Sequence, residues 1–492
     1  MALLSLPLLV PACAPRPLRG SGSGTFVEAV SRALADPSLA HSGVTFLAIS
    51  LDRGDTLFAR EVDRLYTPAS NRKLFTAASA LHWLGPDHRF RTTLVATGPI
   101  EADTLRGDIV LLGRGDPDLL PAHLAALADT LAASGARAIA GDLRADDAWF
   151  DDVEWGAGWM WDDGPYWEWP YVTALTVADN VVTVTARPGP RVGDPVAIAL
   201  DPPTGYVTLN VAAVTAAAGA PSELVVDRHW DPKENVIDVT GALALDADPI
   251  VARRTVEDPA LYAATLLLEL LEARGVEVLG VARHGDLAGM EAAIGGAGGG
   301  VTDAMIDTVA VHVSEPLSES IRNFLKISDN LTGELLVKAV GASVAGPPGT
   351  YENGLAAERA FLAREVGIDT TAQMLADGSG VSRYNLVTAR QIVALLRYMT
   401  TRDDLFPSYS AALPVAGVDG TLETRMRGTA AEGRAGAKTG TLNGVTALSG
   451  YVPSADGERL AFSLMMEFYT GSSAPRRAVQ DSLVAALARF RR

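Results

Sequence analysis

The stretch at residues 70–86 reads "SNRKLFTAASALHWLGP". Its apolar residues recur at helical spacing, and Gly85-Pro86 is a helix stop, so a helix is predicted. Ser70 and Lys73 then lie one turn apart on the same face, within hydrogen-bonding reach. The pattern fits either an ordinary helix start or a nucleophile beside its base. The apolar face comprises Leu74, Ala77, Ala78, Leu81 and Leu84.

Strand patterns occur near both ends of the chain. Residues 43–62 read as two strands joined by a turn, after a helical pattern at 25–36. Residues 435–454 and 459–471 read as three more strands, and 474–492 as an amphipathic helix. We therefore expect an α+β fold whose antiparallel sheet combines strands from both ends of the sequence.

The middle of the chain has a different character, with short strands and turns and a glycine-rich run at its end. A length of 492 residues also favours two or three domains. We expect a leader and linker at 1–24, a discontinuous catalytic domain at 25–95 plus 301–492, and an inserted accessory region at 96–300. The insertion divides into two mainly β subdomains, at about 96–180 plus 250–300 and about 181–249.

The composition excludes several classes of function. A net charge of −18 argues against a nucleic-acid partner, because binding phosphates needs a basic surface. The chain has no Gly-x-Ser-x-Gly elbow, His-Glu-x-x-His motif, Walker A loop or cysteine metal knuckle. Its seven histidines are scattered without ligand spacing. If the protein is a serine hydrolase, its base is not expected to be histidine.

The first residues suggest export. "MALLSLPLLVPAC" has the apolar length of a secretory signal, well short of the roughly 20 residues that span a bilayer. Ala12 before Cys13 resembles a bacterial lipoprotein cleavage site, which would place a lipid on this single cysteine and anchor the protein to a membrane. The alternatives are a true start further upstream or a disordered tail. We expect an exported protein, periplasmic or associated with the cell envelope.

Two further motifs complement the Ser70–Lys73 pair: Ser328-Asp329-Asn330 and Lys438-Thr439-Gly440. Lys73 can act as a base only if its pKa is lowered, which burial and the cation of Lys438 would both achieve. Ser328 could relay a proton to a leaving amine, and Asn330 could orient Lys73 and a substrate amide. Each motif supplies something that a serine–lysine pair lacks.

The remaining roles concern the substrate and the developing negative charge. A strand carrying "KTGT" would present Lys438 and the hydroxyls of Thr439 and Thr441 to a substrate carboxylate, with Gly440 between them. The backbone N–H groups of Ser70 and Thr441 would form an oxyanion hole. The three motifs thus describe one candidate catalytic and substrate-binding site.

In these motifs the chain resembles the low-molecular-mass (class C) penicillin-binding proteins of the D-alanyl-D-alanine carboxypeptidase/endopeptidase type, which carry a large insertion after the Ser-x-x-Lys motif. The 255-residue separation of Lys73 and Ser328 fits that insertion. Arg72 departs from the pattern, since an apolar or small residue is expected there, and this departure is not expected to touch the chemistry. The resemblance is carried by "SNRKLFTAASALHWLGPDHRFRT", "GRGDPDL", "AGDLRADDAWFDD", "SEPLSESIRNFLKISDNLTGEL", "ADGSGVSRYNLVTAR", "GVDGTLETRM" and "AGAKTGTLNGVTALSGYV".

The resemblance implies a serine β-lactamase/penicillin-binding transpeptidase-like domain, with a five-stranded antiparallel sheet flanked by helices. It also implies an acyl-enzyme mechanism on peptidoglycan stem peptides, with β-lactam antibiotics as covalent inhibitors of Ser70 and with neither metal nor organic cofactor. A β-lactamase or esterase on the same fold is one alternative. A non-catalytic penicillin-binding scaffold is another, although the intact motifs argue against it.

Two other stretches allow a functional and a structural interpretation. Residues 146–171 hold six of the eight tryptophans and eight acidic residues. They suit a binding platform, but a packed irregular loop with an acidic rim is the favoured interpretation. The turn 377–380 lies near the active cleft by resemblance, where Ser379 and Arg383 either shape the cleft or serve only the turn.

Overall fold

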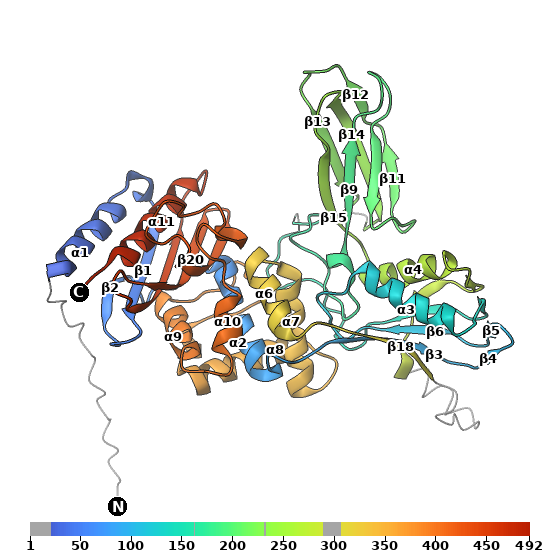
Figure 1. The fold of residues 1–492 in the computed structure, drawn as a ribbon, viewed down its shortest axis with the longest axis horizontal. Coiled ribbons are helices and arrows are strands. Elements are labelled where there is room, and N and C mark those ends of the chain that lie inside the picture. The colour runs from blue at the N-terminus through green and yellow to red at the C-terminus, as the bar shows by residue number, and fades with distance from the viewer. Residues whose placement is uncertain (1–20, 162, 231–232, 289–306) are drawn as a thin grey trace, which may run out of the picture. The chain divides into compact units, whose positions relative to one another are not determined.

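The structure is a computed structural model, and it describes residues 21–161, 163–230, 233–288 and 307–492 (Figure 1). The expectations for Cys13 and the leader, and for the glycine run at 294–300, lie outside the described residues. The chain forms two compact units. The first contains Met1–Tyr66, Val387–Arg397 and Pro414–Arg492, and the second contains Thr67–Leu386 and Tyr398–Leu413.

The first unit is built on a five-stranded antiparallel sheet of order β19-β20-β21-β1-β2. The sheet joins strands from the two ends of the chain, which appear in blue and red in Figure 1, and this confirms the predicted α+β architecture. β1 is buried along almost its whole length because it lies inside the sheet. The strands are β1 (Gly43–Ser50), β2 (Thr56–Arg60), β19 (Gly436–Leu442), β20 (Val445–Pro453) and β21 (Arg459–Glu467).

Helices α1 (Ser21–Leu34) and α11 (Ala474–Arg489) pack against each other beside this sheet. The ring of Phe26 meets the ring of Phe490 edge to face, at 5.3 Å between centroids. α1 begins before Phe26, the first apolar residue of the expected helix, because helix ends follow backbone hydrogen bonds and not only apolar periodicity. α9 (Ala389–Met399) is joined to the sheet by a hydrogen bond, in which the Tyr451 hydroxyl on β20 donates to the Leu396 carbonyl.

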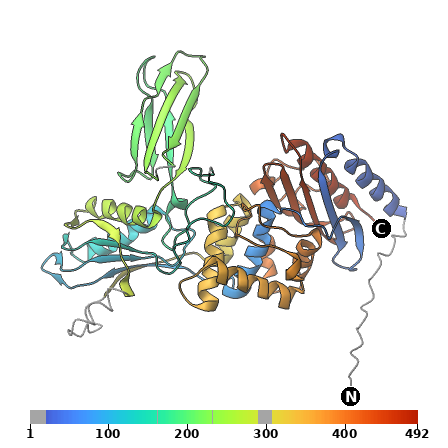
Figure 2. The same cartoon turned by 180° about the vertical axis from the view of Figure 1, so that it is seen from behind.

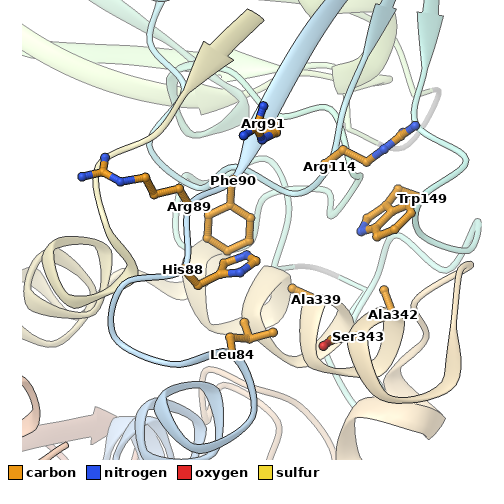
Figure 3. A pocket seen from close by; sticks show the side chains of 10 residues that line it. All are labelled: Leu84, His88, Arg89, Phe90, Arg91, Arg114, Trp149, Ala339, Ala342 and Ser343. Atoms are coloured by element: carbon orange, nitrogen blue, oxygen red, sulfur yellow. The ribbon is translucent and has the colours of Figure 1, made fainter. Parts of the chain in front are cut away.

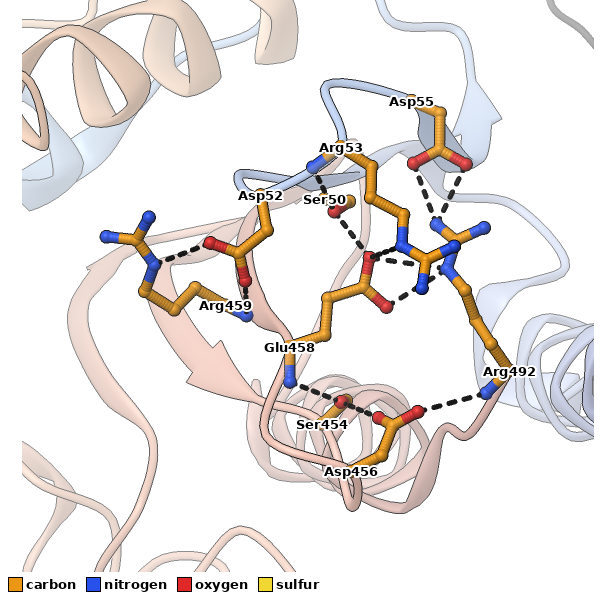
Figure 4. A network of polar contacts seen from close by, with 9 residues as sticks. All are labelled: Ser50, Asp52, Arg53, Asp55, Ser454, Asp456, Glu458, Arg459 and Arg492. Atoms are coloured by element: carbon orange, nitrogen blue, oxygen red, sulfur yellow. Dashed lines mark hydrogen bonds and ion pairs between the residues drawn. The ribbon is translucent and has the colours of Figure 1, made fainter.

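The turns at one end of the sheet are joined by a network of charges (Figure 4). Glu458, only 8% exposed, accepts from the Ser50 hydroxyl and pairs with Arg492 at 3.0 Å and Arg53 at 3.5 Å. One nitrogen of Arg492, Nη2, also donates to both carboxylate oxygens of Asp55, at 2.7 and 2.8 Å. The network therefore ties the β1–β2 turn to the β20–β21 turn and to the residues that follow α11.

The second unit contains a helical layer that positions the candidate site. α7 packs along α8 and α2, and α6 precedes α7 directly (Figures 1 and 2). Buried residues cover most of α7, as expected for a helix surrounded by others. The helices are α2 (Lys73–Leu84), α6 (Leu317–Ile327), α7 (Asn330–Ala345), α8 (Tyr351–Phe361) and α10 (Phe406–Ala411).

The inserted region of this unit is mainly β. Its five-stranded sheet has the order β17-β8-β6-β3-β18. The paired strands β3 and β18 come from the segments that flank the predicted insertion, around residues 96 and 300, so this sheet includes chain on both sides of the insertion. α3 (Pro121–Ala133) and α4 (Pro259–Glu272) pack against each other in the same apolar core. The strands of this sheet are β3 (Arg91–Ala96), β6 (Ile109–Leu112), β8 (Leu143–Asp146), β17 (Ala282–His284) and β18 (Asp307–Val313).

Three smaller sheets complete the inserted region, and its division into two subdomains stays a prediction. One has the order β16-β7-β5-β4, one the order β10-β9-β15, and in one β14 pairs with β11, β12 and β13. Their strands are β4 (Ile100–Glu101), β5 (Thr104–Leu105), β7 (Ala138–Ile139), β9 (Val181–Arg187), β10 (Ala197–Asp201), β11 (Thr208–Val211), β12 (Val214–Ala216), β13 (Glu223–Arg228), β14 (Val236–Ala244), β15 (Ile250–Thr255) and β16 (Glu277–Val278).

In the part of the chain that the structure describes, every helix is too short or too polar to cross a bilayer.

The charge network gives a first testable prediction. We expect Glu458→Ala to lower the unfolding free energy of the first unit by about 1–3 kcal/mol, because it removes a buried acceptor for a hydroxyl and two guanidinium groups. Glu423→Ala is the control, since its pair with Arg427 is more than half exposed. Thermal unfolding measures both, and equal midpoints for the two variants would contradict the prediction.

Candidate active site

Ser70 lies in a tight 3₁₀ turn, Ala69–Arg72, that runs directly into α2. Ala69 has a φ of 47°, a left-handed conformation that is unusual for alanine. Ser70 is half-buried, and its Oγ lies 3.2 Å from Nζ of Lys73, the first residue of α2. The predicted one-turn spacing of this pair is therefore present, with Ser70 in the turn that precedes the α-helix.

The Lys73 amine is fully buried and surrounded by acceptors. Besides Ser70, it donates to Asn330 Oδ1 and to the Ser379 carbonyl, each at 2.7 Å. Burial lowers its pKa to about 8, and the positive charge of Arg72 adds to this lowering. The carboxylates of Asp329, Asp377 and Glu334 oppose the shift. The amine is thus held near the point where it can lose its proton close to neutral pH.

The Ser328-Asp329-Asn330 segment joins α6 to α7 next to this amine. Ser328 ends α6 in a left-handed conformation, with a φ of 64°. The Asp329 side chain caps α7 by accepting from the Thr332 N–H at 2.6 Å. Asn330 then uses both ends of its amide, since Oδ1 accepts from Lys73 and Nδ2 donates to the Glu168 carbonyl at 2.6 Å. Asn330 is therefore fixed relative to the lysine.

A loop at 377–380 completes the surroundings of Lys73. The N–H groups of Gly378 and Ser379 donate to the buried Glu334 carboxyl, each at 2.8 Å, and this orients the Ser379 carbonyl that accepts from Lys73. Burial raises the pKa of Glu334 to about 7, and the charge of Asp377 adds to that shift. Sequence reasoning placed this loop near the cleft but did not find Glu334, whose only signal is its position four residues after Asn330 on one helix.

Gly380 explains how closely this loop approaches the nucleophile turn. Its φ is +87°, and a Cβ placed there would lie 2.0 Å from the Ala69 carbonyl oxygen and 2.7 Å from the Arg72 Cβ. Only glycine allows both the backbone conformation and the contact. The loop and the turn are thus fitted to each other.

The tryptophan-rich segment, residues 146–171, makes hydrogen bonds with residues that surround Lys73. Trp159 is buried and its indole N–H donates to Asp377 at 3.1 Å, while the Glu168 carbonyl holds Asn330. The Trp155 ring packs near the rings of Trp159 and Trp230, both at 5.1 Å. These contacts fit the packed-loop interpretation of residues 146–171, with a structural role for the loop next to the site.

Lys438, Thr439, Gly440 and Thr441 lie on β19, an outer strand of the sheet in the first unit. Lys438 is buried and donates to the Thr439 carbonyl at 3.0 Å. Thr439 and Thr441 share the other face of the strand because successive side chains alternate, and Thr439 is hydrogen-bonded to Thr421 at 2.8 Å. The structure thus brings Ser70, Lys73 and Asn330 together in one unit and places the "KTGT" strand in the other.

A separate hollow lies on the other side of α7 (Figure 3). Its volume is about 440 Å³, and Ala339, Ala342 and Ser343 form its α7 wall. These positions face away from Asn330 and Glu334 on a helix of 3.6 residues per turn. The hollow therefore contains none of the predicted site residues.

Among the described residues, no group of three or more histidine, cysteine or acidic side chains could hold a metal ion.

Comparisons with known proteins place the chain among D-Ala-D-Ala carboxypeptidases. The D-Ala-D-Ala carboxypeptidase 3 (S13) family matches residues 26–490. The chain is 41% identical to a D-alanyl-D-alanine carboxypeptidase of an Actinomadura species, over 99% of this chain and 90% of that protein. It is 28% identical to the D-alanyl-D-alanine carboxypeptidase DacB of Haemophilus influenzae, over 88% of this chain and 86% of that protein.

Solved structures give the same match. The crystal structure of penicillin binding protein 4 from Haemophilus influenzae superposes with a TM-score of 0.79 at 27% identity, covering 94% of this chain and 99% of that one. The same protein complexed with a β-lactam gives a TM-score of 0.74 at 25% identity, with the same coverage. These matches confirm the predicted penicillin-binding type of fold.

The close fit of Gly380 leads to a prediction about stability. We expect Gly380→Ala to cost about 3 kcal/mol or more, because the new Cβ would overlap the Ala69 carbonyl in addition to straining the backbone. Gly457→Ala is a matched control, since its φ is +86° and nothing lies within 4 Å of the added carbon, so only the strain of about 1–2 kcal/mol remains. Thermal unfolding compares them, and a smaller loss for Gly380→Ala would contradict the fit.

The burial of Lys73 leads to a prediction about its titration. The chain has only five lysines, so a protein labelled with ¹³C at lysine Cε gives a sparse NMR spectrum. The signal that disappears in Lys73→Arg is assigned to Lys73. We expect this signal to titrate near pH 8, because burial disfavours the charged amine. A Lys73 signal that titrates only above pH 10 would contradict this environment.

Proposed function

Because the chain belongs to the D-Ala-D-Ala carboxypeptidase 3 (S13) family, we propose that it is a serine D-Ala-D-Ala carboxypeptidase/endopeptidase in which Ser70 is the nucleophile and Lys73 its general base. The observation that carries this proposal is the half-buried Ser70 hydroxyl, 3.2 Å from a fully buried amine. Peptidoglycan stem peptides are the proposed substrates, and β-lactams would acylate the same serine.

The lowered pKa of Lys73 makes the base role chemically reasonable. With a pKa of about 8, about one amine in ten is neutral at pH 7, roughly 300 times more than for an ordinary lysine. The neutral amine takes the Oγ proton while Oγ attacks the carbonyl carbon of the penultimate D-Ala. The bond between that carbon and the nitrogen of the last D-Ala then breaks, and water later hydrolyses the ester to release Ser70.

The remaining motif residues receive roles that fit their local structure. Ser328, at the end of α6, would pass a proton to the leaving amine, and Asn330 would orient Lys73 and the substrate amide. Lys438 would add positive charge to the site, and Thr439 and Thr441 on the edge strand β19 would bind the substrate carboxylate beside Gly440. The backbone N–H groups of Ser70 and Thr441 would stabilise the oxyanion.

The location of the substrate bears on export and anchoring. Peptidoglycan lies outside the cytoplasmic membrane, so an enzyme that acts on its stem peptides has to be exported. This supports the interpretation of residues 1–24 as a leader and linker. Lipidation of Cys13 and the periplasmic or envelope location remain predictions, since they depend on residues outside the described part of the chain.

The nucleophile assignment can be tested directly. We expect the wild type to be labelled by a fluorescent penicillin and to release D-Ala from diacetyl-Lys-D-Ala-D-Ala, and Ser70→Ala to do neither, because the attacking oxygen is gone. Ser343→Ala, on the opposite side of α7, should behave as the wild type. Equal labelling of Ser70→Ala would assign the nucleophile elsewhere, and a wild type inert in both assays would refute the proposed function.

The lifetime of the acyl-enzyme separates this function from the alternatives. A DD-peptidase should stay acylated by penicillin, whereas a β-lactamase should hydrolyse it with rapid turnover. A penicillin-binding scaffold would label without releasing D-Ala.

A further inference from the structure

Arg72, the last residue of the turn that carries Ser70, makes a buried ion pair with Glu358 of α8. Its two terminal nitrogens contact the two carboxylate oxygens at 2.7 and 2.8 Å. The side chains are 0% and 2% exposed. Nothing in the conversion of a substrate by Ser70 and Lys73 requires this pair. A buried ion pair is not in itself strongly stabilising, because desolvating two charges offsets their attraction.

Hydrogen bonds connect this pair to the acceptors of Lys73. Arg72 Nη1 also donates to the Thr76 hydroxyl at 3.0 Å, and that hydroxyl donates to the Gly378 carbonyl at 2.6 Å. The next carbonyl, of Ser379, accepts from Lys73. A continuous path of contacts therefore runs from Glu358 to the amine of the general base.

The charge of Arg72 also acts on Lys73 directly. Asp329, Asp377 and Glu334 face the amine with negative charge, and Arg72 opposes them with the positive charge that lowers the pKa of Lys73. The two-pronged contact with Glu358 holds that charge in one place. Arg72 Nε finds no acceptor among the described residues, so the position of the guanidinium depends on Glu358 and Thr76.

We propose that the Arg72–Glu358 pair is a positioning device for Lys73: through Thr76 it fixes the carbonyls of residues 378–379 against which the amine is held, and it keeps a permanent positive charge beside that amine. The inference rests on the role proposed for Lys73. Arg72 and Glu358 touch no reacting atom and act through the lysine.

Two variants separate the two effects. The double variant Arg72→Met/Glu358→Leu removes the charge without leaving a buried ion unpaired, so folding is expected to survive. Thr76→Val keeps the charge pair and removes both hydrogen bonds of the Thr76 hydroxyl, the one from Arg72 and the one to the Gly378 carbonyl. The matched control is Arg228→Met/Glu257→Leu. It removes another largely buried arginine–glutamate pair, which lies in the inserted region and has a contact of 2.6 Å.

The readouts are the pH profile of acylation by a fluorescent penicillin and the ¹³C titration of Lys73. For the double variant we expect the midpoints of both to move to higher pH, because the charge of Arg72 lowers the pKa of Lys73 more strongly than the opposite charge of Glu358 raises it. We also expect acylation at pH 7 to be about 10- to 100-fold slower, since displaced catalytic groups cost rates of this size. Thr76→Val should slow acylation with little change in the titration, and the control should change thermal stability only.

A double variant with the wild-type profile and titration would overturn the proposal, whatever its thermal stability, because a merely structural pair moves stability alone. A Thr76→Val variant acylated at the wild-type rate would overturn the hydrogen-bonded path. If the wild type itself were not acylated, the proposed function would fail. The Lys73 titration would still decide the inference about the pair, since it needs no activity.

Discussion

The site depends on burying one amine. An ammonium group taken out of water must meet acceptors in the protein, and Lys73 meets a hydroxyl, a side-chain amide and a backbone carbonyl. These come from the nucleophile turn, from α7 and from the 377–380 loop, so three distant segments converge on a single nitrogen. Burial favours the neutral form while the surrounding carboxylates favour the charged one, and the balance leaves the pKa of Lys73 at about 8.

That balance explains the density of polar groups in an otherwise apolar helical layer. Glu334 holds two amides of the loop, and Asp377 accepts from the backbone of Gly380, the backbone of Ser382 and the Trp159 indole. Each of these carboxyl groups stabilises the loop and at the same time adds negative charge near the lysine. The carboxylates raise the pKa of Lys73, and the positive charge of Arg72 lowers it again in part.

Much of the fold could be predicted from local patterns. Periodicity indicated α2, the strands of the first unit and the helix after them, and alternation with turn residues indicated the mixed β insertion. The one-turn spacing of Ser70 and Lys73 was predicted from helical periodicity, although Ser70 lies in the 3₁₀ turn before α2. Asn330 could be assigned only because its motif resembles a known one, since 257 residues separate it from Lys73.

The rest of the site carries little sequence signal. The Ser379 contact is made by a backbone carbonyl, which every residue possesses, so its identity does not reveal it. Arg72 looked like a departure from the expected apolar or small residue, and its reason became clear only when Glu358, 286 residues away, was found against it. Residues that are close in space but far apart in sequence are connected by packing, which no short motif records.

The pairing of β1 with β21 has a consequence for how the protein is made. Gly43 opposes Glu467 in that ladder, so the buried strand β1 lies against a strand that leaves the ribosome some 400 residues later. At about 5–20 residues per second, β1 waits roughly 20–80 seconds for its neighbour during synthesis. During that interval β1 can pair only with β2, and the backbone edge that later pairs with β21 is open to aggregation. The sheet of the first unit therefore cannot be completed until the last strands of the chain have been synthesised.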